Sequence, residues 1–592
     1  MNTVTDEQFA HSVSSSRPPA APPFSDSTPI ALLTGMRADV WREALFQGGP
    51  CSYAASTATS QESTRQLLHA IEFGAPVDFE GDRSIRRQQP NHPIDDAHLQ
   101  KVRDVIAADV KDNKKAGPLP LEPWPQVNGH PLCASPIGAV PKKHSVKVRV
   151  IHDLSAPKGG DSINGGIDDG SLEISSFGHA AKAVRAAGRG AWLIKLDVEA
   201  AYKQMPVRPE DWHLLGFEFE GKLYYERVLP FGLRSSCRLW ELVAAALHFL
   251  CAKLNCGTPH EVIHYVDDFL FVVSPIGGEP AAQRLLTLAL ALCQHLGVPM
   301  ATGPGKVEGP AQCLTFLGIE LDTLKLEARL PQRRLDELHA LMVEWQSYTR
   351  ASVKQLQSLT GLLNFACTCV APGRVYLRRI INHTAHLIAQ NIGRSHHTQV
   401  KLTPAVLADV QWWVEMLRDW NGVSLLYEDT WTAAPVIELY TDACNSGYGA
   451  YFAGRWFAGR WCIAELQSAT RNERISMPFL EMRALVMAAA TWGHLWRGKK
   501  ITFHCDCEPV VLAFKSMRSR TATQMHQIRS MHMLAARHNF DFRVWHIVGE
   551  TNVIADELSR AGDSQAFRGM CPLAQAEPDI VIAPPLPTSD DL

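Results

Sequence analysis

The sequence has no apolar run that approaches the ~20 residues a helix needs to cross a bilayer. The longest candidate, Leu285 to Leu296, is interrupted by Thr287, Gln294 and His295. The N-terminus also lacks the basic region followed by an apolar stretch that marks a secretory signal. These absences predict an intracellular protein, in the cytoplasm or the nucleus or both, with no membrane partner.

Cysteine-based zinc motifs and an excess of positive charge are also missing. The fourteen cysteines form no pair of Cys-x-x-Cys motifs and no cysteine–histidine spacing suited to zinc. The 58 basic residues against 61 acidic ones give a net charge of −3. This balance disfavours nucleic-acid binding through global charge but leaves room for local basic patches. With 46% hydrophobic and 20% charged residues, the 592-residue chain is typical of a globular protein with roughly four domains.

Composition and periodicity divide the chain into six segments. In order, they are a disordered tail (1–30), an N-terminal extension (31–120), a region of alternating strands and helices (121–325), a helical region (326–430), a strand-rich domain (431–565) and a second disordered tail (566–592). The tails are rich in Ser, Pro or acids and cannot bury enough apolar surface to offset the entropy of ordering. The pattern predicts a multidomain protein of the α+β or α/β class.

Three aspartates end predicted strands in the region of alternating strands and helices. Asp197 closes the strand that begins at Trp192, and Asp267 and Asp268 form the tip of a hairpin between two apolar runs. Adjacent carboxylates repel each other unless a cation lies between them. Hard oxygen ligands suit Mg²⁺, and three such groups can hold two metal ions for phosphoryl transfer. A solvated Asp-Asp turn is the alternative for the pair considered alone.

Four motifs in chain order resemble the palm of retroelement reverse transcriptases. They are LDVEAAY, LPFGLRSS (Leu229–Ser236), YVDD (Tyr265–Asp268) and LTFLGIEL (Leu314–Leu321). The resemblance implies a right-hand polymerase, with an N-terminal extension or fingers at 31–120, fingers and palm at 121–325 and a helical thumb or connection at 326–430. It also implies that Asp197, Asp267 and Asp268 are catalytic and bind two Mg²⁺ ions, with Mn²⁺ as a possible substitute.

The same resemblance assigns nucleotide-binding roles to five residues. Lys142 and Arg149 lie in VPKKHSVKVRVIHDLS, which resembles the fingers segment that contacts the incoming triphosphate. The eight positions from Lys142 to Arg149 hold four basic residues, which suit phosphates, although a solvated basic loop is the alternative. Tyr202 matches the aromatic gate that blocks a 2′-hydroxyl, and Gly232 matches a position where backbone approaches the nucleotide. Lys306 matches a lysine that can protonate pyrophosphate, with a surface lysine as the alternative.

Four acids in the strand-rich domain resemble the metal site of ribonuclease H. Asp442 ends a strand, Glu481 opens a helix near its positive end, Asp506 follows another strand and Asp556 lies in the last helix. Each acid taken singly is more often a surface residue. The resemblance implies that the four are catalytic and hold two Mg²⁺ ions, which activate water against the RNA strand of a hybrid.

One position departs from that family. Many ribonucleases H carry a mobile histidine in the loop before the last acid, and here Glu550 occupies that place in a shorter loop. His546 lies on the preceding strand and is not its equivalent. This departure leaves the role of Glu550 and the rate of cleavage open.

Two further stretches narrow the resemblance to DIRS-type retrotransposons. They are Val353–Arg379 and Trp412–Leu426, which resemble the connecting region of those elements. DIRS-type elements fuse reverse transcriptase to ribonuclease H and use a tyrosine recombinase, often encoded separately. The resemblance implies an RNA template, a DNA primer, RNA–DNA hybrids and dNTPs as partners, and that recombinase as a further one.

The implied function is RNA- and DNA-directed DNA synthesis with ribonuclease H cleavage by a transposable element. A polymerase that makes RNA is one alternative, which Tyr202 and the ribonuclease H motifs disfavour. A domesticated or decayed copy that only binds nucleic acid is the other, and the presence of all seven expected carboxylates disfavours it.

Overall fold

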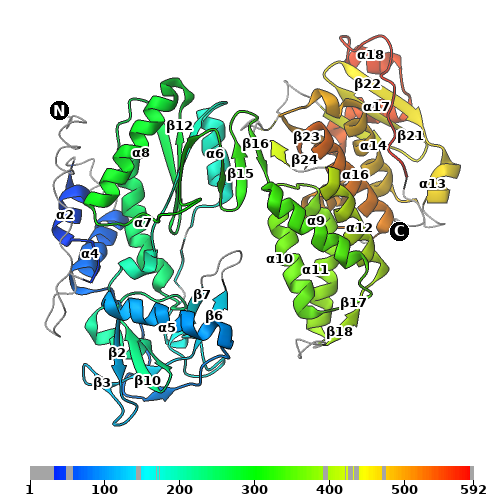
Figure 1. The fold of residues 1–592 in the computed structure, drawn as a ribbon. Helices are drawn as coiled ribbons and strands as arrows, with labels where there is room; N and C mark the ends of the chain where they lie inside the picture. The colour runs from blue at the N-terminus through cyan, green and yellow to red at the C-terminus, as the bar shows by residue number, and fades with distance from the viewer. Residues whose placement is uncertain are drawn as a thin grey trace. The chain divides into compact units, whose positions relative to one another are not determined.

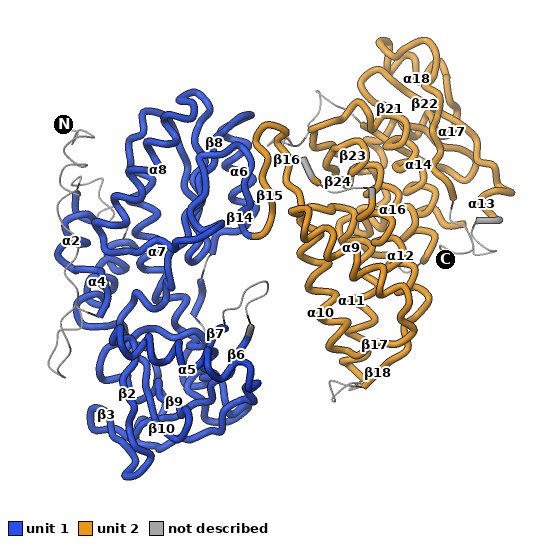
Figure 2. The backbone as a smooth tube through the Cα atoms, viewed as in Figure 1, with its two compact units in different colours: residues 1–317 blue, residues 318–592 orange. Residues whose placement is uncertain are grey.

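The computed structural model describes most of the chain. The described residues are 33–47, 58–141, 148–168, 170–172, 174–390, 398–419, 422–424, 431, 439–469, 475–519 and 521–586. The chain divides into two compact units, residues 1–317 and 318–592 (Figure 2). The tail expected at residues 1–30 lies outside the described part. Within that part, no helix has both the length and the apolar character needed to span a membrane.

A four-stranded antiparallel sheet in the order β11-β12-β8-β13 is the centre of the first unit. Its strands are β8 (Trp192–Asp197), β11 (His260–Tyr265), β12 (Asp268–Val273) and β13 (Val307–Ala311). Helices α7 (Ser236–Ala252) and α8 (Gly278–His295) lie on one side, and α6 (Phe177–Ala187) lies on the other (Figure 1). Because both faces are covered, β12 is almost entirely apolar, and its Phe271 is fully buried. We call this sheet the palm sheet, because it carries the three aspartates of the expected palm.

A second sheet of the same unit has the order β1-β5-β9-β10-β2, and we call it the fingers sheet because it lies in the expected fingers region. Its strands are β1 (Arg87–Gln88), β2 (Lys115–Leu119), β5 (Cys133–Ala134), β9 (Gly216–Phe219) and β10 (Lys222–Glu226), and a separate hairpin pairs β6 (Ile137–Pro141) with β7 (Val148–His152). Helix α5 (Asp96–Lys111) packs Val102 and Ile106 against Phe217 and Phe219.

The N-terminal extension expected at 31–120 is divided between these two parts. Helices α2 (Ala38–Phe46) and α4 (Ala58–Phe73) join the palm core, where Trp41 is fully buried and donates its indole N–H to the carbonyl of Leu296 at 2.9 Å. Helix α5 and strands β1 and β2 belong to the fingers. The amphipathic helices need a core to cover, and the nearest cores are those of the palm and fingers.

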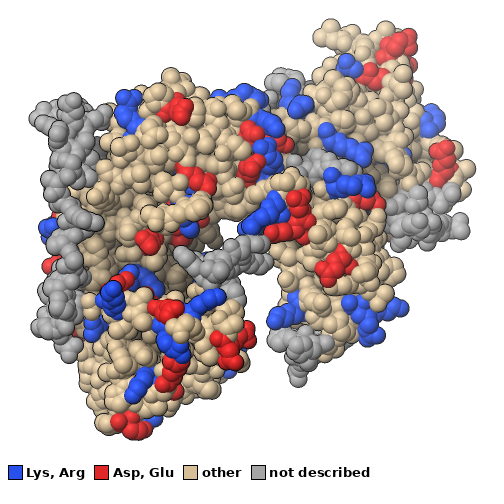
Figure 3. Space-filling model, viewed as in Figure 1, with Lys and Arg blue, Asp and Glu red and all other residues tan. Residues whose placement is uncertain are grey.

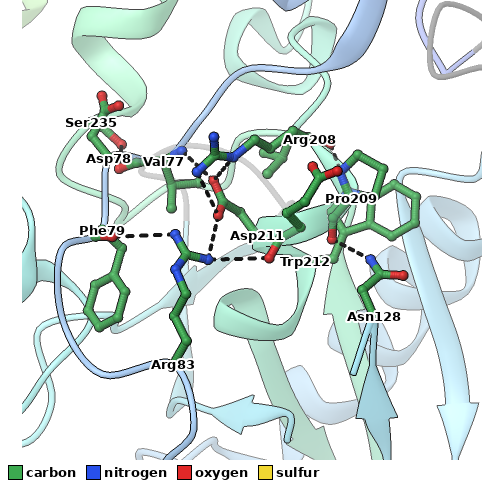
Figure 4. A network of polar contacts seen from close by, with 12 residues as sticks. Val77, Asp78, Phe79, Arg83, Asn128, Arg208, Pro209, Asp211, Trp212 and Ser235 are labelled. Atoms are coloured by element: carbon green, nitrogen blue, oxygen red, sulfur yellow. Dashed lines mark hydrogen bonds and ion pairs between the residues drawn. The ribbon is translucent and has the colours of Figure 1, made fainter. Parts of the chain in front are cut away.

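A buried carboxylate ties the extension to the short helix η5 (Pro209–Leu215) (Figure 4). Asp211 is fully buried and accepts hydrogen bonds from the backbone N–H of Val77 at 2.9 Å and from the guanidinium groups of Arg83 and Arg208, each at 2.7 Å. Ser235 donates to the carbonyl of Val77 at 2.9 Å. With two cations and a backbone donor around one carboxylate, the pKa of Asp211 is lowered although burial alone would raise it.

The second unit begins with a helical region and a small sheet. Its elements are β15 (Ile319–Asp322), β16 (Glu327–Arg329), α9 (Gln332–Gln346), β17 (Arg350–Ser352), α10 (Val353–Ala366), α11 (Gly373–Ala389), β18 (Gln399–Lys401), α12 (Pro404–Asp419) and β19 (Val423–Ser424). A reciprocal cap starts α10, because the Ser352 hydroxyl accepts the N–H of Gln355 and the Gln355 side chain accepts the N–H of Ser352.

A five-stranded sheet in the order β22-β21-β20-β23-β24 follows. Its strands are β20 (Leu439–Ala443), β21 (Gly447–Phe452), β22 (Arg455–Arg460), β23 (Lys500–Cys505) and β24 (Asp541–His546), and its helices are α13 (Ile463–Ala469), α14 (Met477–Trp492), α15 (Glu508–Ser516), α16 (Ala522–His538) and α17 (Val553–Arg560). The first three strands are antiparallel, and β23 and β24 run parallel to β20. The strand-rich domain expected at 431–565 is therefore a mixed sheet accompanied by helices.

The helical region and this sheet belong to one unit rather than two separate domains. The fully buried Asp409 of α12 lies 2.7 Å from the guanidinium of Arg529 on α16 and 3.5 Å from that of Arg379 on α11. The ring of Tyr376 on α11 also lies 4.6 Å from the Arg529 guanidinium. Because a buried charge must be paired, this contact fixes the two parts together.

The expectation of a disordered tail at 566–592 is wrong for residues 566–586. Helix α18 (Gln565–Met570) buries Phe567 beside Trp456. The chain then runs along the edge strand β22, where Gln575 and Asp579 donate their N–H groups to the carbonyls of Gly454 and Trp456. Proline-rich sequence suits this extended segment beside an edge strand. Proline lacks an N–H donor, and such a segment needs few N–H donors to pair with the strand. Residues 587–592 lie outside the described part.

Charges of both signs are interspersed on the visible face of the chain, as expected from its small net charge (Figure 3).

Candidate functional site

The palm sheet brings three predicted acids to one end. Strand register pairs Asp197 on β8 directly with Asp268 on β12, and Asp268 is also paired with Tyr265 on β11. Asp267 lies in the turn between β11 and β12, and its carbonyl accepts the N–H of Val198 at 3.0 Å. Strand alternation and hairpin closure are therefore enough to assemble these carboxylates.

The hairpin tip has an unusual backbone conformation. Val266 has φ of 57°, in the left-handed region that β-branched residues rarely enter. Its carbonyl accepts the indole N–H of Trp240, which is fully buried on α7, at 2.9 Å. Such strain costs on the order of 1–3 kcal/mol and persists where the surrounding structure holds it. The tip is thus fixed in a turn that directs Asp267 and Asp268 toward Asp197.

Two lysines face these carboxylates. Lys306 forms an ion pair with Asp197, and the Lys195 ammonium lies 3.8 Å from Asp268. Burial, opposed by Lys195 and reinforced by the neighbouring aspartates, raises the pKa of Asp268 to about 6. Burial and Asp197 likewise raise the pKa of Asp267. Three carboxylates thus face two ammonium groups.

This donor set fits a hard divalent cation. Oδ1 of Asp268 is buried and has no hydrogen-bond partner among the described residues. Asp197, Asp267 and Asp268 offer carboxylate oxygens only, which are the ligands that Mg²⁺ prefers. A cation between them would offset the burial and the mutual repulsion that raise the pKa values of Asp267 and Asp268.

A pocket of about 430 Å³ opens beside the three acids. Its lining includes Asp197, Asp267, Arg149, Tyr202, Phe231 and Lys306. Arg149 lies on β7 of the fingers hairpin, whereas Lys142 lies outside the described residues. Four of the five predicted nucleotide-binding positions are therefore described, and three of these four line one cavity.

Tyr202 is held at the pocket wall by contacts that the motif alone did not reveal. It lies in the short helix η4 (Ala201–Gln204), its ring centroid is 5.1 Å from that of Phe231, and its hydroxyl hydrogen-bonds to Cys237. Burial and the Cys237 contact raise the pKa of the phenol. Cys237 and Phe231 thus lie next to Tyr202, the residue expected to act as the gate.

Gly232 does not line the pocket. Glycine is needed there because the backbone passes close to the backbone of His152. Gly232 has φ of 104°, and a Cβ at this position would lie 2.0 Å from the carbonyl oxygen of His152. Its own carbonyl accepts the side-chain amide of Asn164 at 2.8 Å. Because only glycine fits here, the chain can turn and expose Phe231 to the pocket.

The second unit also gathers four predicted acids. Asp442 lies on β20, Asp506 directly follows β23 and Asp556 lies on α17. Glu481 lies in the second turn of α14, which begins at Met477, rather than at the helix start. Asp506 raises the pKa values of both Asp442 and Glu481, and Asp556 raises that of Asp442, so the four acids lie near one another.

Burial is the main cause of the raised pKa values of two acids in this second site, Glu481 and Asp442. It raises the pKa of Glu481 to about 9, with Asp442 and Asp506 adding to the effect and the N–H of Ala443 opposing it. It raises the pKa of Asp442 to about 6, although the Ser559 hydroxyl donates to Asp442 at 2.6 Å. Oε2 of Glu481 is buried without a hydrogen-bond partner in the described part of the chain. This orphaned oxygen fits a divalent cation.

The surroundings of this site include a thiol and a short turn. Ligand atoms of Glu481, Cys505 and Asp506 lie within 4.8 Å of one another. Glu550 is exposed in the turn η8 (Gly549–Thr551), and a Cβ on Gly549 would lie 3.3 Å from Oδ2 of Asp506. His546 ends β24 and is exposed. The backbone of the turn, rather than a described side-chain contact of Glu550, borders the acids.

The sequence from His260 to His264 has the order His-Glu-Val-Ile-His, which on a helix could bind zinc. Here it forms β11, and the two histidines have different partners. His260 contacts the carbonyl of Cys251, and His264 contacts Glu241 at 2.8 Å and His248 at 2.9 Å. The strand conformation therefore rules out the helical zinc motif.

Comparison with known proteins shows that the region containing the palm sheet is similar to a known protein family. Residues 144–321 match the family model described as reverse transcriptase (RNA-dependent DNA polymerase). Protein P of Heron hepatitis B virus is 26% identical over 176 residues, which is 29% of this chain and 21% of that protein. Polyprotein P3 of Commelina yellow mottle virus is 21% identical over 379 residues, which is 63% of this chain and 18% of that protein. The chain thus spans about a fifth of the length of these relatives.

A solved structure of the foamy viral protease–reverse transcriptase in complex with double-stranded DNA aligns with a TM-score of 0.48 and 16% identity. The alignment covers 89% of this chain and 84% of that one. The matched family model and the palm geometry together identify residues 144–321 as a reverse transcriptase domain.

Proposed function

We propose that this chain copies RNA, and then DNA, into DNA from deoxynucleoside triphosphates, and that its second unit cleaves the RNA strand of RNA–DNA hybrids. The observation that carries the proposal is the pairing of Asp197 with Asp268 beside a pocket that Arg149 and Lys306 also line. The family match of residues 144–321 supports it independently.

In the palm, Asp197, Asp267 and Asp268 would hold Mg²⁺ or Mn²⁺. Such ions, when bound, make a primer 3′-hydroxyl more acidic and neutralise charge on the phosphates. The remaining tasks fall to the chain itself. Arg149 and Lys306 give the pocket the positive charge that a triphosphate needs, and the Tyr202 ring forms the wall that a 2′-hydroxyl would meet.

In the second unit, Asp442, Glu481, Asp506 and Asp556 would hold the same kind of ion, which when bound supplies an activated water. Ser559 keeps one oxygen of Asp442 in place through its 2.6 Å hydrogen bond. Arg560 holds Asp556 at 2.7 Å from the following helical turn. Both contacts orient ligands before any ion binds.

An RNA template, a DNA primer and their hybrid are the partners that this function requires. Contacts to the nucleic-acid backbone would supply the affinity, while base pairing would carry the sequence information. This division is compatible with a chain of small net charge that has a local basic stretch from Lys142 to Arg149.

Primer extension on poly(rA)/oligo(dT), with a parallel assay of RNA cleavage in a hybrid, tests both halves of the proposal. The full chain is expected to extend the primer and cut the RNA only when Mg²⁺ or Mn²⁺ is added. Hybrid binding without either reaction would instead favour a domesticated copy that only binds nucleic acid.

We further propose that the chain comes from a DIRS-type element, in which a separately encoded tyrosine recombinase would be its partner. The proposal rests on the connecting motifs at Val353–Arg379 and Trp412–Leu426. Sequencing the genomic copy tests it. A recombinase reading frame next to this one is expected, and an integrase frame would contradict the assignment.

A further inference from the structure

Four charged side chains meet beside the palm pocket, and none of them belongs to the motifs discussed above. Asp109 lies in the last turn of α5, and Lys203 lies in η4. Lys115 is the first residue of β2, and Glu226 is the last residue of β10. The Lys115 ammonium lies 2.9 Å from Asp109 and 2.7 Å from Glu226, and the Lys203 ammonium lies 2.7 Å from the other oxygen of Asp109. All four line the pocket.

The cluster is buried and electrically balanced. Asp109, Lys115 and Glu226 are 7%, 4% and 5% exposed. Two cations face two anions, so the cluster is neutral as a whole. Removing one member would leave an uncompensated buried charge, which is far more costly than replacing a balanced pair.

Lys203 is the member that reaches the palm, and it directly follows Tyr202. The short helix that holds both residues begins after Ala200, which has φ of 46°. The N–H of Lys203 donates to the carbonyl of Ala200 at 2.7 Å. This strained, one-turn segment has few backbone bonds of its own, so a side-chain anchor has a strong influence on its position.

Asp109 connects that segment to the fingers. Helix α5 packs against β2 and against β7, the strand that carries Arg149. The cluster therefore links the element that bears the gate to the element that bears a phosphate-binding arginine.

We propose that the cluster of Asp109, Lys115, Lys203 and Glu226 is a latch that positions Tyr202 and thereby sets how strictly the pocket rejects ribonucleotides. The inference rests on the proposed polymerase function. Lys203 and Asp109 act as positioning residues, because they hold the gate rather than touch the sugar. A displacement of about 1 Å at a positioning contact can change a rate by about 10²-fold, so loss of the latch loosens selection without removing the metal ligands.

The test measures single-nucleotide incorporation of dGTP and GTP by the full chain, with kcat and KM determined separately. Lys203→Met and Asp109→Asn are each expected to lower the ratio of kcat/KM for dGTP over GTP by about tenfold. The double variant removes one charge of each sign and leaves the neutral Lys115–Glu226 pair. Its loss should therefore be smaller than the product of the two single losses.

Asp211→Asn is the matched control. Asp211 is fully buried, carries two arginine partners in the same unit and does not line the pocket (Figure 4). It should lower the melting temperature as much as the latch variants but leave the dGTP/GTP ratio unchanged. A shift of that ratio in Asp211→Asn, or an unchanged ratio in Lys203→Met and Asp109→Asn, would overturn the latch. A wild-type chain that incorporates no dGTP at all would instead overturn the polymerase function, and the latch with it.

Discussion

The two acidic sites of this chain are built in different ways. In the palm, the acids come from adjacent antiparallel strands, and two lysines lie beside them. In the second unit, the acids come from a strand, a helix, the end of another strand and a second helix. Hydrogen bonds from Ser559 and Arg560 steady two of them there, and burial raises the pKa of Glu481 to about 9. The palm site depends on strand register, and the second site depends on the whole domain fold.

Asp268→Asn would break the palm site most severely. The substitution keeps the shape of the side chain but removes one metal-binding charge, so extension should fall at least about a thousandfold, or ~4 kcal/mol. RNA cleavage should continue at its ordinary rate. Primer extension and hybrid cleavage by the same preparation provide the measurement.

Glu261→Gln is the control for that variant, because Glu261 lies on the neighbouring strand β11 and is exposed. Extension by Glu261→Gln should match the wild type. Normal extension by Asp268→Asn would show that the paired aspartates do not form the polymerase site.

Tyr202→Ala tests the aromatic wall of the palm pocket. The loss of the ring should admit ribonucleotides and lower the preference for dGTP over GTP by about tenfold or more. Incorporation of dGTP should stay measurable, since the metal ligands are untouched. Phe365→Ala, a change at an aromatic residue in the second unit, is the comparison that should leave the preference as it is.

Acid should destabilise the first unit before the second. Burial lowers the pKa of His152, His213 and His248 in the first unit to about 4, whereas in the second unit only His532 is lowered as far among the described residues. A neutral histidine favoured by folding contributes stability above its unfolded pKa of about 6.5, and that stability is lost as the pH falls toward 4. Each such group can cost about 2 kcal/mol by pH 5.

The His213→Phe variant sharpens that contrast, since His213 is fully buried and its ring stacks on that of His130 at 4.6 Å. Calorimetry of the full chain between pH 7.5 and pH 5 should show a smaller loss of melting temperature for the variant. An equal loss in both proteins would mean that His213 does not titrate with unfolding.

Glu550→Ala should have the smallest effect. Glu550 is exposed in the turn beside Asp506, and the backbone of Gly549 lies closer to that acid. Hybrid cleavage should change by less than about tenfold, or ~1.4 kcal/mol. A fall to the level of an Asp442→Asn variant would make Glu550 part of the catalytic site.

The meeting of the palm aspartates was largely predictable, because short stretches of sequence determine the strand and the hairpin that carry them. A strand ending in Asp197 and a hairpin with two aspartates at its tip imply their meeting once the strands pair. The latch was not predictable, because Lys203 and Asp109 are 94 positions apart and only the packing of α5 joins them. The C-terminal strap was misjudged because its proline-rich composition is the same for a free tail and for a segment bound to a sheet edge.

The central claim, that two separate sites perform two reactions, is tested most directly by one substrate labelled on both the primer and the RNA strand. The full chain should extend the primer and cut the RNA in the same reaction. Asp267→Asn should lose extension and keep cleavage, and Asp442→Asn should lose cleavage and keep extension. Loss of both reactions in either variant, with an unchanged melting temperature, would contradict the account.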